Sequence, residues 1–212
     1  MKTSICKILL CLLLFTVFQS QLKAERVKKL HKSWPVNKVL SLSVENKFGN
    51  ISFLNTRNDS VTIDIVVETD NKDNRNWTSI SDLIDFSISF ENGTINAQTI
   101  FNEKFKTNQE FTIAYTINIP ADKPLDVTNK FGDVTLSDLK AKGKFEISYG
   151  NIFGNSILAP SDQMIEMDLK YSNASFETIN RLKAQIAYSK FRANKIETTN
   201  SELFVTSYLV FK

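Results

Sequence analysis

The fold of this chain is decided by a short motif that occurs twice in close succession. Asn129–Val134 has the sequence NKFGDV, and Ile147–Ile152 has the sequence ISYGNI. Each copy contains an aromatic residue, then glycine, then aspartate or asparagine, and ends on an apolar residue. Apolar and polar residues alternate before the second motif, in Phe145–Tyr149, and a period of two residues indicates a half-buried strand.

Outward from these copies, the motif recurs along most of the chain. Its aromatic residue is found at Phe48, Phe131, Tyr149, Tyr171, Tyr188 and Tyr208, and glycine follows it at Gly49, Gly132 and Gly150. From Phe131 onward, successive aromatic residues are 18, 22, 17 and 20 residues apart. A motif at a nearly fixed period indicates one structural unit repeated along the chain.

Other columns of the repeat keep an apolar character. Four residues before the aromatic residue lie Val44, Val127, Phe145, Met167, Ala184 and Phe204. Three residues after it lie Ile51, Val134, Ile152, Ala174, Phe191 and Phe211. Eight residues after it, in consecutive units, lie Leu139, Ile157, Ile179 and Ile196. Because a single unit cannot bury these side chains alone, the columns predict units stacked on one another.

We interpret each unit as two short strands joined at an aromatic-Gly-Asn or aromatic-Ser-Asn corner. Glycine or asparagine is expected to supply the positive φ that a tight corner demands. The sequence therefore predicts an all-β fold, a β-solenoid-like stack of units of about 17–22 residues with strands about 4.8 Å apart. A coiled, sandwich-like stack is the alternative. In both, the aromatic column is an interior or corner ladder, and packing is its expected role rather than carbohydrate stacking.

The N-terminal half of the chain is less regular. Alternation in Val61–Val67, Phe86–Phe90 and Phe111–Ile119 predicts longer strands and hairpins that cap or widen the stack. Apolar residues at spacings of three and four predict a short helix or turn over Asn74–Leu83. We expect an exposed segment over 25–35 and one domain over 36–212, irregular over 36–120 and regular over 121–212.

The first 24 residues have the pattern of a signal peptide. Lysines precede an eleven-residue apolar stretch, Ile8–Phe18, which is too short to span a bilayer as a helix. Cleavage is expected after Ala24, with Ser20 as an alternative. Both cysteines of the chain lie in this segment, so an exported chain would carry no disulfide. That combination favours the periplasm or cell surface of a Gram-negative bacterium over a eukaryotic secreted domain.

Removal of this segment changes the charge of the chain. The whole sequence has a formal charge of +3, and residues 1–24 contain three lysines and no acidic residue. The exported chain is therefore neutral, which argues against nucleic-acid binding. No transmembrane span is expected after the segment is removed. The basic run Arg26–Lys32 is interpreted as a solvated N-terminus, with contact to an anionic surface as the alternative.

The stretch Tyr115–Val134, YTINIPADKPLDVTNKFGDV, resembles the core of the putative-adhesin domain family of exported bacterial envelope proteins. Val44–Ile51, VENKFGNI, resembles the opening unit of that family, and the resemblance extends over residues 36–212. It implies a β-solenoid-like fold and a role at the cell surface, and it supplies no catalytic residue. This sequence departs from the family where Ser172, Ser189 and Leu209 replace the glycine.

Candidate catalytic and metal-binding groups are few. His31, the only histidine, has no evident partner, and Asp70, Asp73 and Asn74 lack the glycine and the final glutamate of a calcium loop. Outward carboxylates are interspersed with lysines and are interpreted as a solvated face; they are Asp133, Glu146, Asp168 and Glu177. Trp34 and Trp77 lie outside the repeats, and Trp77 is interpreted as a core residue. We therefore predict no catalytic residue, no cofactor and no metal.

These observations favour a non-catalytic binding or structural module. Its expected partner is an envelope protein or a surface glycan, because stacked units build extended surfaces. The chain stops inside its last unit, at Tyr208–Lys212, so end-to-end self-association through this unit is also expected. The alternatives are a periplasmic partner in envelope signalling and, with less support, a carbohydrate-active β-helix enzyme.

Overall fold

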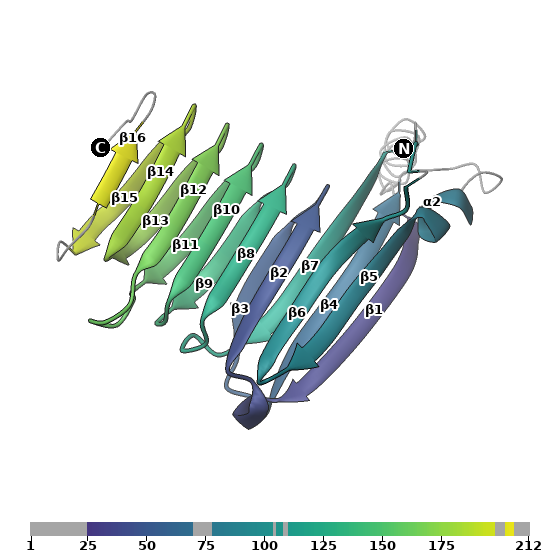
Figure 1. Ribbon diagram of the computed structural model, residues 1–212, viewed down its shortest axis with the longest axis horizontal. Coiled ribbons are helices and arrows are strands. Elements are labelled where there is room, and N and C mark those ends of the chain that lie inside the picture. The colour runs from purple at the N-terminus through teal and green to yellow at the C-terminus, as the bar shows by residue number, and fades with distance from the viewer. Residues whose placement is uncertain (1–24, 70–77, 104, 108–109, 198–201, 206–212) are drawn as a thin grey trace, which may run out of the picture.

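The computed structural model describes residues 25–69, 78–103, 105–107, 110–197 and 202–205. It is all-β, with two eight-stranded mixed sheets lying one behind the other (Figure 1). The rear sheet has the order β1 (Glu25–Pro35), β4 (Ser60–Thr69), β7 (Phe111–Ile119), β3 (Ile51–Asn55), β9 (Val134–Leu139), β11 (Asn151–Ile157), β13 (Asn173–Asn180), β15 (Lys190–Glu197).

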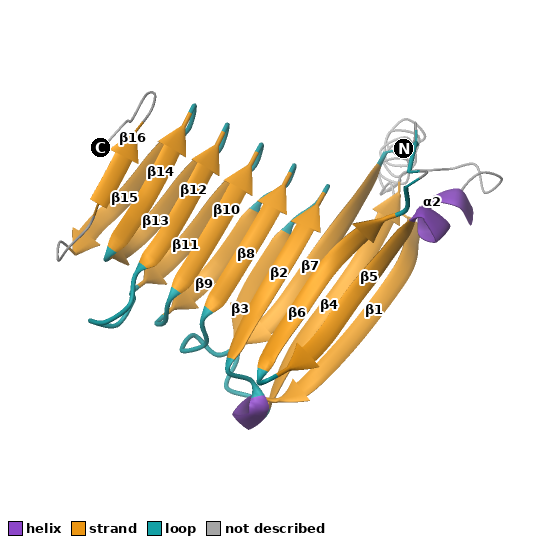
Figure 2. Cartoon of the chain, viewed as in Figure 1, coloured by secondary structure: helices purple, strands orange, loops and turns teal. Residues whose placement is uncertain are grey.

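The front sheet begins at the C-terminal end of the molecule. Its order is β16 (Glu202–Val205), β14 (Leu182–Ala187), β12 (Ile165–Lys170), β10 (Gly143–Ser148), β8 (Leu125–Lys130), β2 (Ser41–Lys47), β6 (Thr94–Phe101), β5 (Ile84–Glu91). Two short helices, η1 (Val36–Lys38) and α2 (Thr78–Leu83), lie between strands (Figure 2).

From β8 to β15 the chain alternates between the two sheets. β8 and β9 pair in parallel with β2 and β3, and from β10 onward each strand pairs in parallel with the strand two places earlier. Parallel neighbours cannot be joined by a tight hairpin, and the strand in the opposite sheet provides the connection. Each pair of strands therefore lengthens both sheets by one strand.

The strand register aligns the predicted apolar columns. Val127 pairs with both Val44 and Phe145, and Ile152 pairs with both Val134 and Ala174. These side chains are buried in one core between the sheets. The last unit is an exception: Leu203, and not Phe204, pairs with Ala184, so our alignment of this unit was wrong by one residue. Two consecutive apolar residues made both alignments compatible with the pattern.

The N-terminal half contains the longer strands and the hairpin that alternation predicted. β4 has ten residues and β7 has nine, against six in β8, β9 and β10. β5 and β6 form an antiparallel pair, and α2 lies within the predicted helical segment. The antiparallel strands β1, β4 and β7 are added to the rear sheet beside β3.

Residues 25–35 were predicted as an exposed segment outside the domain; most of their described side chains are exposed, but the backbone belongs to a sheet. They form β1, which pairs antiparallel with β4 at the edge of the rear sheet. Leu30 and Trp34 are half-buried against the core, whereas Lys29 and Lys32 are exposed. Leu30 and Trp34 are four residues apart and lie on one face of the strand, but the basic residues around Leu30 made this apolar pair hard to recognise in the sequence. Exposed lysines on an edge strand also discourage pairing with a second sheet.

Several sequence predictions lie outside the described residues. They are the signal peptide at 1–24, the loop residues Asp70, Asp73 and Asn74, Trp77, and the last corner at Tyr208. Within the described residues, no helix has the length and apolar composition needed to cross a membrane.

Candidate functional site

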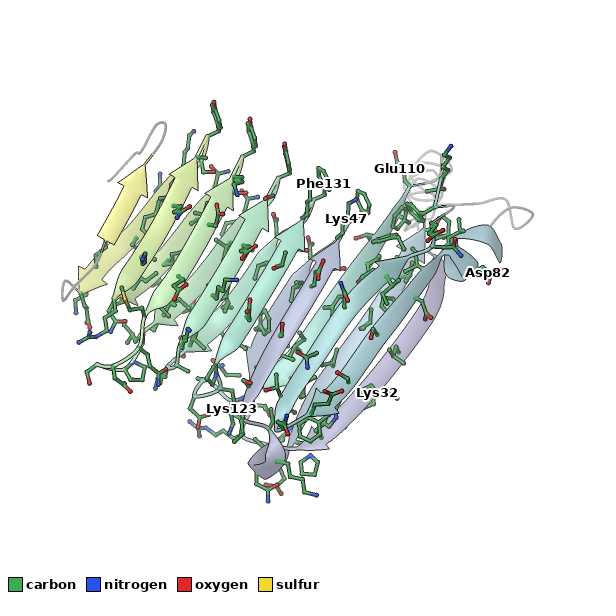
Figure 3. All side chains as sticks on the ribbon, viewed as in Figure 1. Lys32, Lys47, Asp82, Glu110, Lys123 and Phe131 are labelled. Atoms are coloured by element: carbon green, nitrogen blue, oxygen red, sulfur yellow. The ribbon has the colours of Figure 1, made fainter. Side chains whose placement is uncertain are left out.

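An exposed row of stacked rings runs along the edge where strands β2, β8, β10, β12 and β14 end. We call this row the aromatic ladder; it consists of Phe48, Phe131, Tyr149, Tyr171 and Tyr188. Neighbouring ring centroids are 5.3, 5.0, 5.0 and 4.9 Å apart, and neighbouring ring planes differ by at most 20°. Figure 3 shows side chains projecting from this edge, with Phe131 and Lys47 labelled. The ladder is a corner ladder, not an interior one.

The backbone of the corner differs from the prediction. The aromatic residues themselves adopt positive φ, from 52° at Tyr171 and Tyr188 to 65° at Phe48. Gly49, Gly132 and Gly150 do not, so the expectation that glycine supplies the left-handed conformation was wrong. A non-glycine residue in this region is strained, and the surrounding structure must hold it there. Ring stacking and the parallel strands on either side provide that constraint.

The corner glycines are required by close approach of the backbone. A Cβ atom on Gly132 would lie 2.0 Å from the carbonyl oxygen of Gly49, and one on Gly150 would lie 2.0 Å from that of Gly132. Serine replaces glycine in the next two units, where both serines are buried. The Ser189 hydroxyl donates to Ala187 O and accepts from Ser172 N, so these corners are closed by side-chain hydrogen bonds instead.

Exposure increases along the ladder. The exposed fraction is 41% for Phe131, 49% for Tyr149, 52% for Tyr171 and 65% for Tyr188. Because the faces of stacked rings cover one another, the ladder presents ring edges and tyrosine hydroxyls to solvent. At the N-terminal end, Phe48 meets Phe101 and Phe111 edge-on, at 5.7 and 5.6 Å. These two rings cap the ladder.

Polar rows run parallel to the ladder on both sides. The residue before the ring is Lys47, Lys130 or Lys170 in three of the five corners, and the strand register aligns these positions. The Lys47 ammonium lies 4.6 Å from the centroid of Phe48, and the Lys130 ammonium lies 5.2 Å from that of Phe131. The ladder is therefore flanked on the front sheet by a basic row.

The row on the rear-sheet side consists mainly of amides. Asn50 Oδ1 accepts from the Asp133 backbone N–H, and Asp133 Oδ1 accepts from both the backbone N–H and Nδ2 of Asn151. Asn173 Nδ2 then donates to Asn151 Oδ1. These 2.8 Å bonds connect successive units side by side. The one carboxylate in the row is held by two donors, and this partly offsets its negative charge.

The outer face of the front sheet carries mixed charge further from the ladder. Lys144 pairs with Glu146 at 2.7 Å, and Lys170 pairs with Asp168 at 2.8 Å. The hydrogen bond to Glu146 and the charge of Asp126 raise the pKa of Lys144. A shallow hollow of about 170 Å³ lies over β10, β12 and β14, and a second hollow of about 370 Å³ lies on the side of β2, near Ser43. The Lys144 side chain lines both.

A buried hydrogen-bonded chain lies behind the first corner. The Tyr115 hydroxyl and Thr99 Oγ1 are 2.8 Å apart, and Thr99 Oγ1 donates to Asn46 Oδ1 at 2.9 Å. Asn46 Nδ2 donates to the carbonyls of Gly49 and Ile113. Because the Thr99 proton is directed to Asn46, the tyrosine hydroxyl is the donor in its bond. Burial raises the pKa of Tyr115 to about 12, and the hydrogen bond to Thr99 opposes this rise without cancelling it.

The predicted outward carboxylates do not converge. Glu146 and Asp168 are paired with lysines, Asp133 belongs to the amide row, and Glu177 accepts from Asn194 at 2.7 Å on the rear sheet. His31 has a partner that sequence reasoning missed: its Nδ1 lies 2.7 Å from Asp64 Oδ1 on the neighbouring strand β4. Both side chains are exposed. Only the antiparallel register of β1 and β4 brings them together.

The described residues hold no group of three or more His, Cys, Asp or Glu side chains placed to bind a metal ion. Trp34 is half-buried, with its ring centroid 6.4 Å from that of Phe90. It thus connects the end strands β1 and β5 of the two sheets. The aromatic ladder and the polar rows beside it are the most regular exposed feature of the described chain.

No protein-family model matches the chain, and no curated protein matches it. Solved structures are similar to it at low identity. One is described as a putative cell adhesion protein from Clostridium sporogenes, with 7% identity and a TM-score of 0.45, covering 85% of this chain and 99% of that one. Another, a putative adhesin from Bacteroides fragilis, has 13% identity and a TM-score of 0.42, covering 87% and 96%. A putative adhesin from Parabacteroides merdae has 11% identity and a TM-score of 0.27, with the same coverage.

Proposed function

We propose that this chain is an exported, non-catalytic binding module of the bacterial envelope, with a β-solenoid-like, adhesin-type domain. The observation that carries the proposal is the alignment of like side chains into rows along one edge of both sheets. A ring repeats about every 5 Å across five units, with a lysine before it in three of them and an amide two residues after it in three. Such repetition suits an extended ligand better than a single small substrate.

The arrangement of ionisable groups supports binding rather than catalysis. General acid–base chemistry needs groups that converge on one reacting atom. Here Glu146, Asp168 and Asp133 each have a separate partner, and the His31–Asp64 pair lies at an exposed sheet edge. The apolar segment at 8–18 supports export, and the resemblance of the corner motifs to the adhesin-like family supports a place in the envelope.

Protease shaving of intact source cells, followed by mass spectrometry, tests the location. We expect release of peptides from residues 25–212 without lysis, together with binding of the purified chain to at least one surface glycan or matrix protein. Protection of the chain until the outer membrane is opened would contradict surface exposure. It would favour the alternative, a periplasmic partner in envelope signalling.

A further inference from the structure

We propose that the aromatic ladder, with its basic and amide rows, binds an acidic polysaccharide extended along the row of corners. This inference deepens the proposed binding function and rests on it. The surface comprises the five rings of the ladder, the lysines Lys47 and Lys130, and the amides Asn50, Asn151 and Asn173. Lys170 lies in the same row, but its ammonium is paired with Asp168.

The orientation of the rings selects the chemistry of the ligand. A sugar that binds by stacking needs the face of a ring, and the ladder rings cover one another's faces at 4.9–5.3 Å. Their exposed edges carry the positive part of the ring quadrupole. Tyr149 and Tyr171 add phenolic hydroxyls, which can donate hydrogen bonds. Edges of this kind favour carboxylate or sulfate oxygens over the apolar face of a neutral sugar.

The rows on both sides add to this preference. Lys47 and Lys130 place ammonium groups beside the first two rings, at 4.6 and 5.2 Å from the centroids. The amide row carries one carboxylate, and two donors from Asn151 hold Asp133 Oδ1 at 2.8 Å each. An anion at the ladder therefore meets ammonium groups on one side and, on the other, one carboxylate whose charge is partly offset.

The spacing of the corners selects an extended ligand. The same ring recurs at nearly equal intervals, so a linear polymer with a regular anionic group can make the same contact several times. Linked contacts raise the affinity of a polymer well above that of its monomer. We therefore expect the single acidic sugar to bind far more weakly than the polymer.

A second row of charge confines the ligand to a line. Beyond this row, the front sheet carries Glu45, Glu146 and Asp168, which the strand register aligns through Thr128. Glu146 is paired with Lys144, and Asp168 with Lys170, so this part of the sheet is of mixed charge. A planar anionic surface, such as a lipid bilayer, would meet these paired charges and Glu45 as soon as it spread over the sheet, and they offer it no net attraction. A narrow chain lying along the corners would not. The charge pattern thus favours a polysaccharide over a membrane.

Calorimetric titration of the purified full-length protein with polygalacturonate at low salt is the direct test, with dextran as the neutral control. We expect binding of polygalacturonate, weakening as salt is added, and no binding of dextran. The double variant Lys47→Gln/Lys130→Gln should lose about thirtyfold in affinity, which corresponds to roughly 1 kcal/mol for each of the two cations. The matched control Lys29→Gln/Lys32→Gln removes two exposed lysines from β1 and should change affinity less than about twofold.

A further double variant, Tyr149→Phe/Tyr171→Phe, keeps the stack and removes two hydroxyls, so weaker binding with an unchanged melting temperature supports the ladder.

Equal loss of affinity in the two lysine double variants would overturn the inference, as would failure to bind polygalacturonate. Stronger binding to vesicles containing phosphatidylserine than to polygalacturonate would also overturn it. If the chain binds dextran or a matrix protein, and the lysine and tyrosine variants of the ladder bind it equally well, this site is rejected and the proposed function stands. Absence of binding to any glycan or matrix protein would count against both.

Discussion

The two halves of the molecule build the same corner in different ways. Between Phe131 and Tyr188, each unit returns to the corner after 18, 22 or 17 residues, and like residues lie beside like residues. The first corner, at Phe48, is separated from the next by 83 residues, which form β3 to β8. The first corner has no preceding unit to pair with, and strand β7 takes that place: the backbone N–H groups of Ile113 and Tyr115 donate to Phe48 O and Asn50 O.

This difference shows what a repeat requires. In the regular half, the corner is held by contact between identical backbones and by ring stacking. In the irregular half, a buried chain from Tyr115 through Thr99 to Asn46 attaches the corner to β6 and β7. Every glycine corner should therefore be sensitive to an added atom, since a Cβ on Gly49 would lie 2.1 Å from Ile113 O, and the first corner should be sensitive also to the loss of a polar group.

The largest effect is expected from Gly132→Ala. The new Cβ would lie 2.0 Å from the carbonyl oxygen of Gly49, and backbone atoms cannot move aside as a flexible side chain can. We expect a loss of about 3 kcal/mol or more in the free energy of unfolding, measured by urea denaturation. Ser189→Gly is the control, because it removes a hydroxymethyl group with its two hydrogen bonds and adds no atom; it should lose about 2 kcal/mol. Equal losses would show that close approach is not the constraint.

The second effect concerns the first corner at alkaline pH. The pKa of Tyr115 is about 12 in the folded chain against 10.0 ordinarily, so the unfolded chain ionises first. The stabilising contribution is complete below pH 10 and is lost between pH 10 and 12, by about 2–3 kcal/mol. Tyr115→Phe should flatten this part of the stability–pH profile. An unchanged profile in the variant would contradict the assignment to Tyr115.

The third effect distinguishes strain from stacking at a regular corner. Tyr171 has φ of 52° and stacks on rings at 5.0 and 4.9 Å. Tyr171→Ala keeps the strained backbone and loses the stack, at a cost of about 1–2 kcal/mol. Tyr171→Gly also relieves the backbone, so it should be about 1 kcal/mol more stable than the alanine variant. Thermal melting of the pair checks this order, and the reverse order would mean that the corner stores no strain.

The smallest effect is expected at the N-terminal sheet edge. His31 and Asp64 form an exposed pair, with 60% and 44% of their side-chain surface accessible. His31→Gln should change the free energy of unfolding at pH 6 by less than about 0.5 kcal/mol. A loss of several kcal/mol would mean that β1 is held by this pair rather than by Leu30 and Trp34.

Much of the regular half could be predicted because each unit has the same pattern of apolar and aromatic residues as its neighbours. Val127, Phe145 and Met167 occupy one column in the sequence and pair in consecutive strands of the sheet. For the last unit, no later unit was available to check the alignment. Because Leu203 and Phe204 are both apolar, our alignment was shifted by one residue. In the candidate site, the positions of the rings were predicted, whereas their exposure and the flanking rows were not.

The sequence by itself determined the all-β class, the stacked columns and the positions of the corners, because period-two alternation and a repeat of about 20 residues are local patterns. Only the tertiary structure decided that the aromatic residues take positive φ and that glycine is needed for close approach. It also decided the pairing of His31 with Asp64 and the place of β1. These features depend on contacts between residues far apart in the chain, and local sequence patterns do not predict which distant segments come into contact.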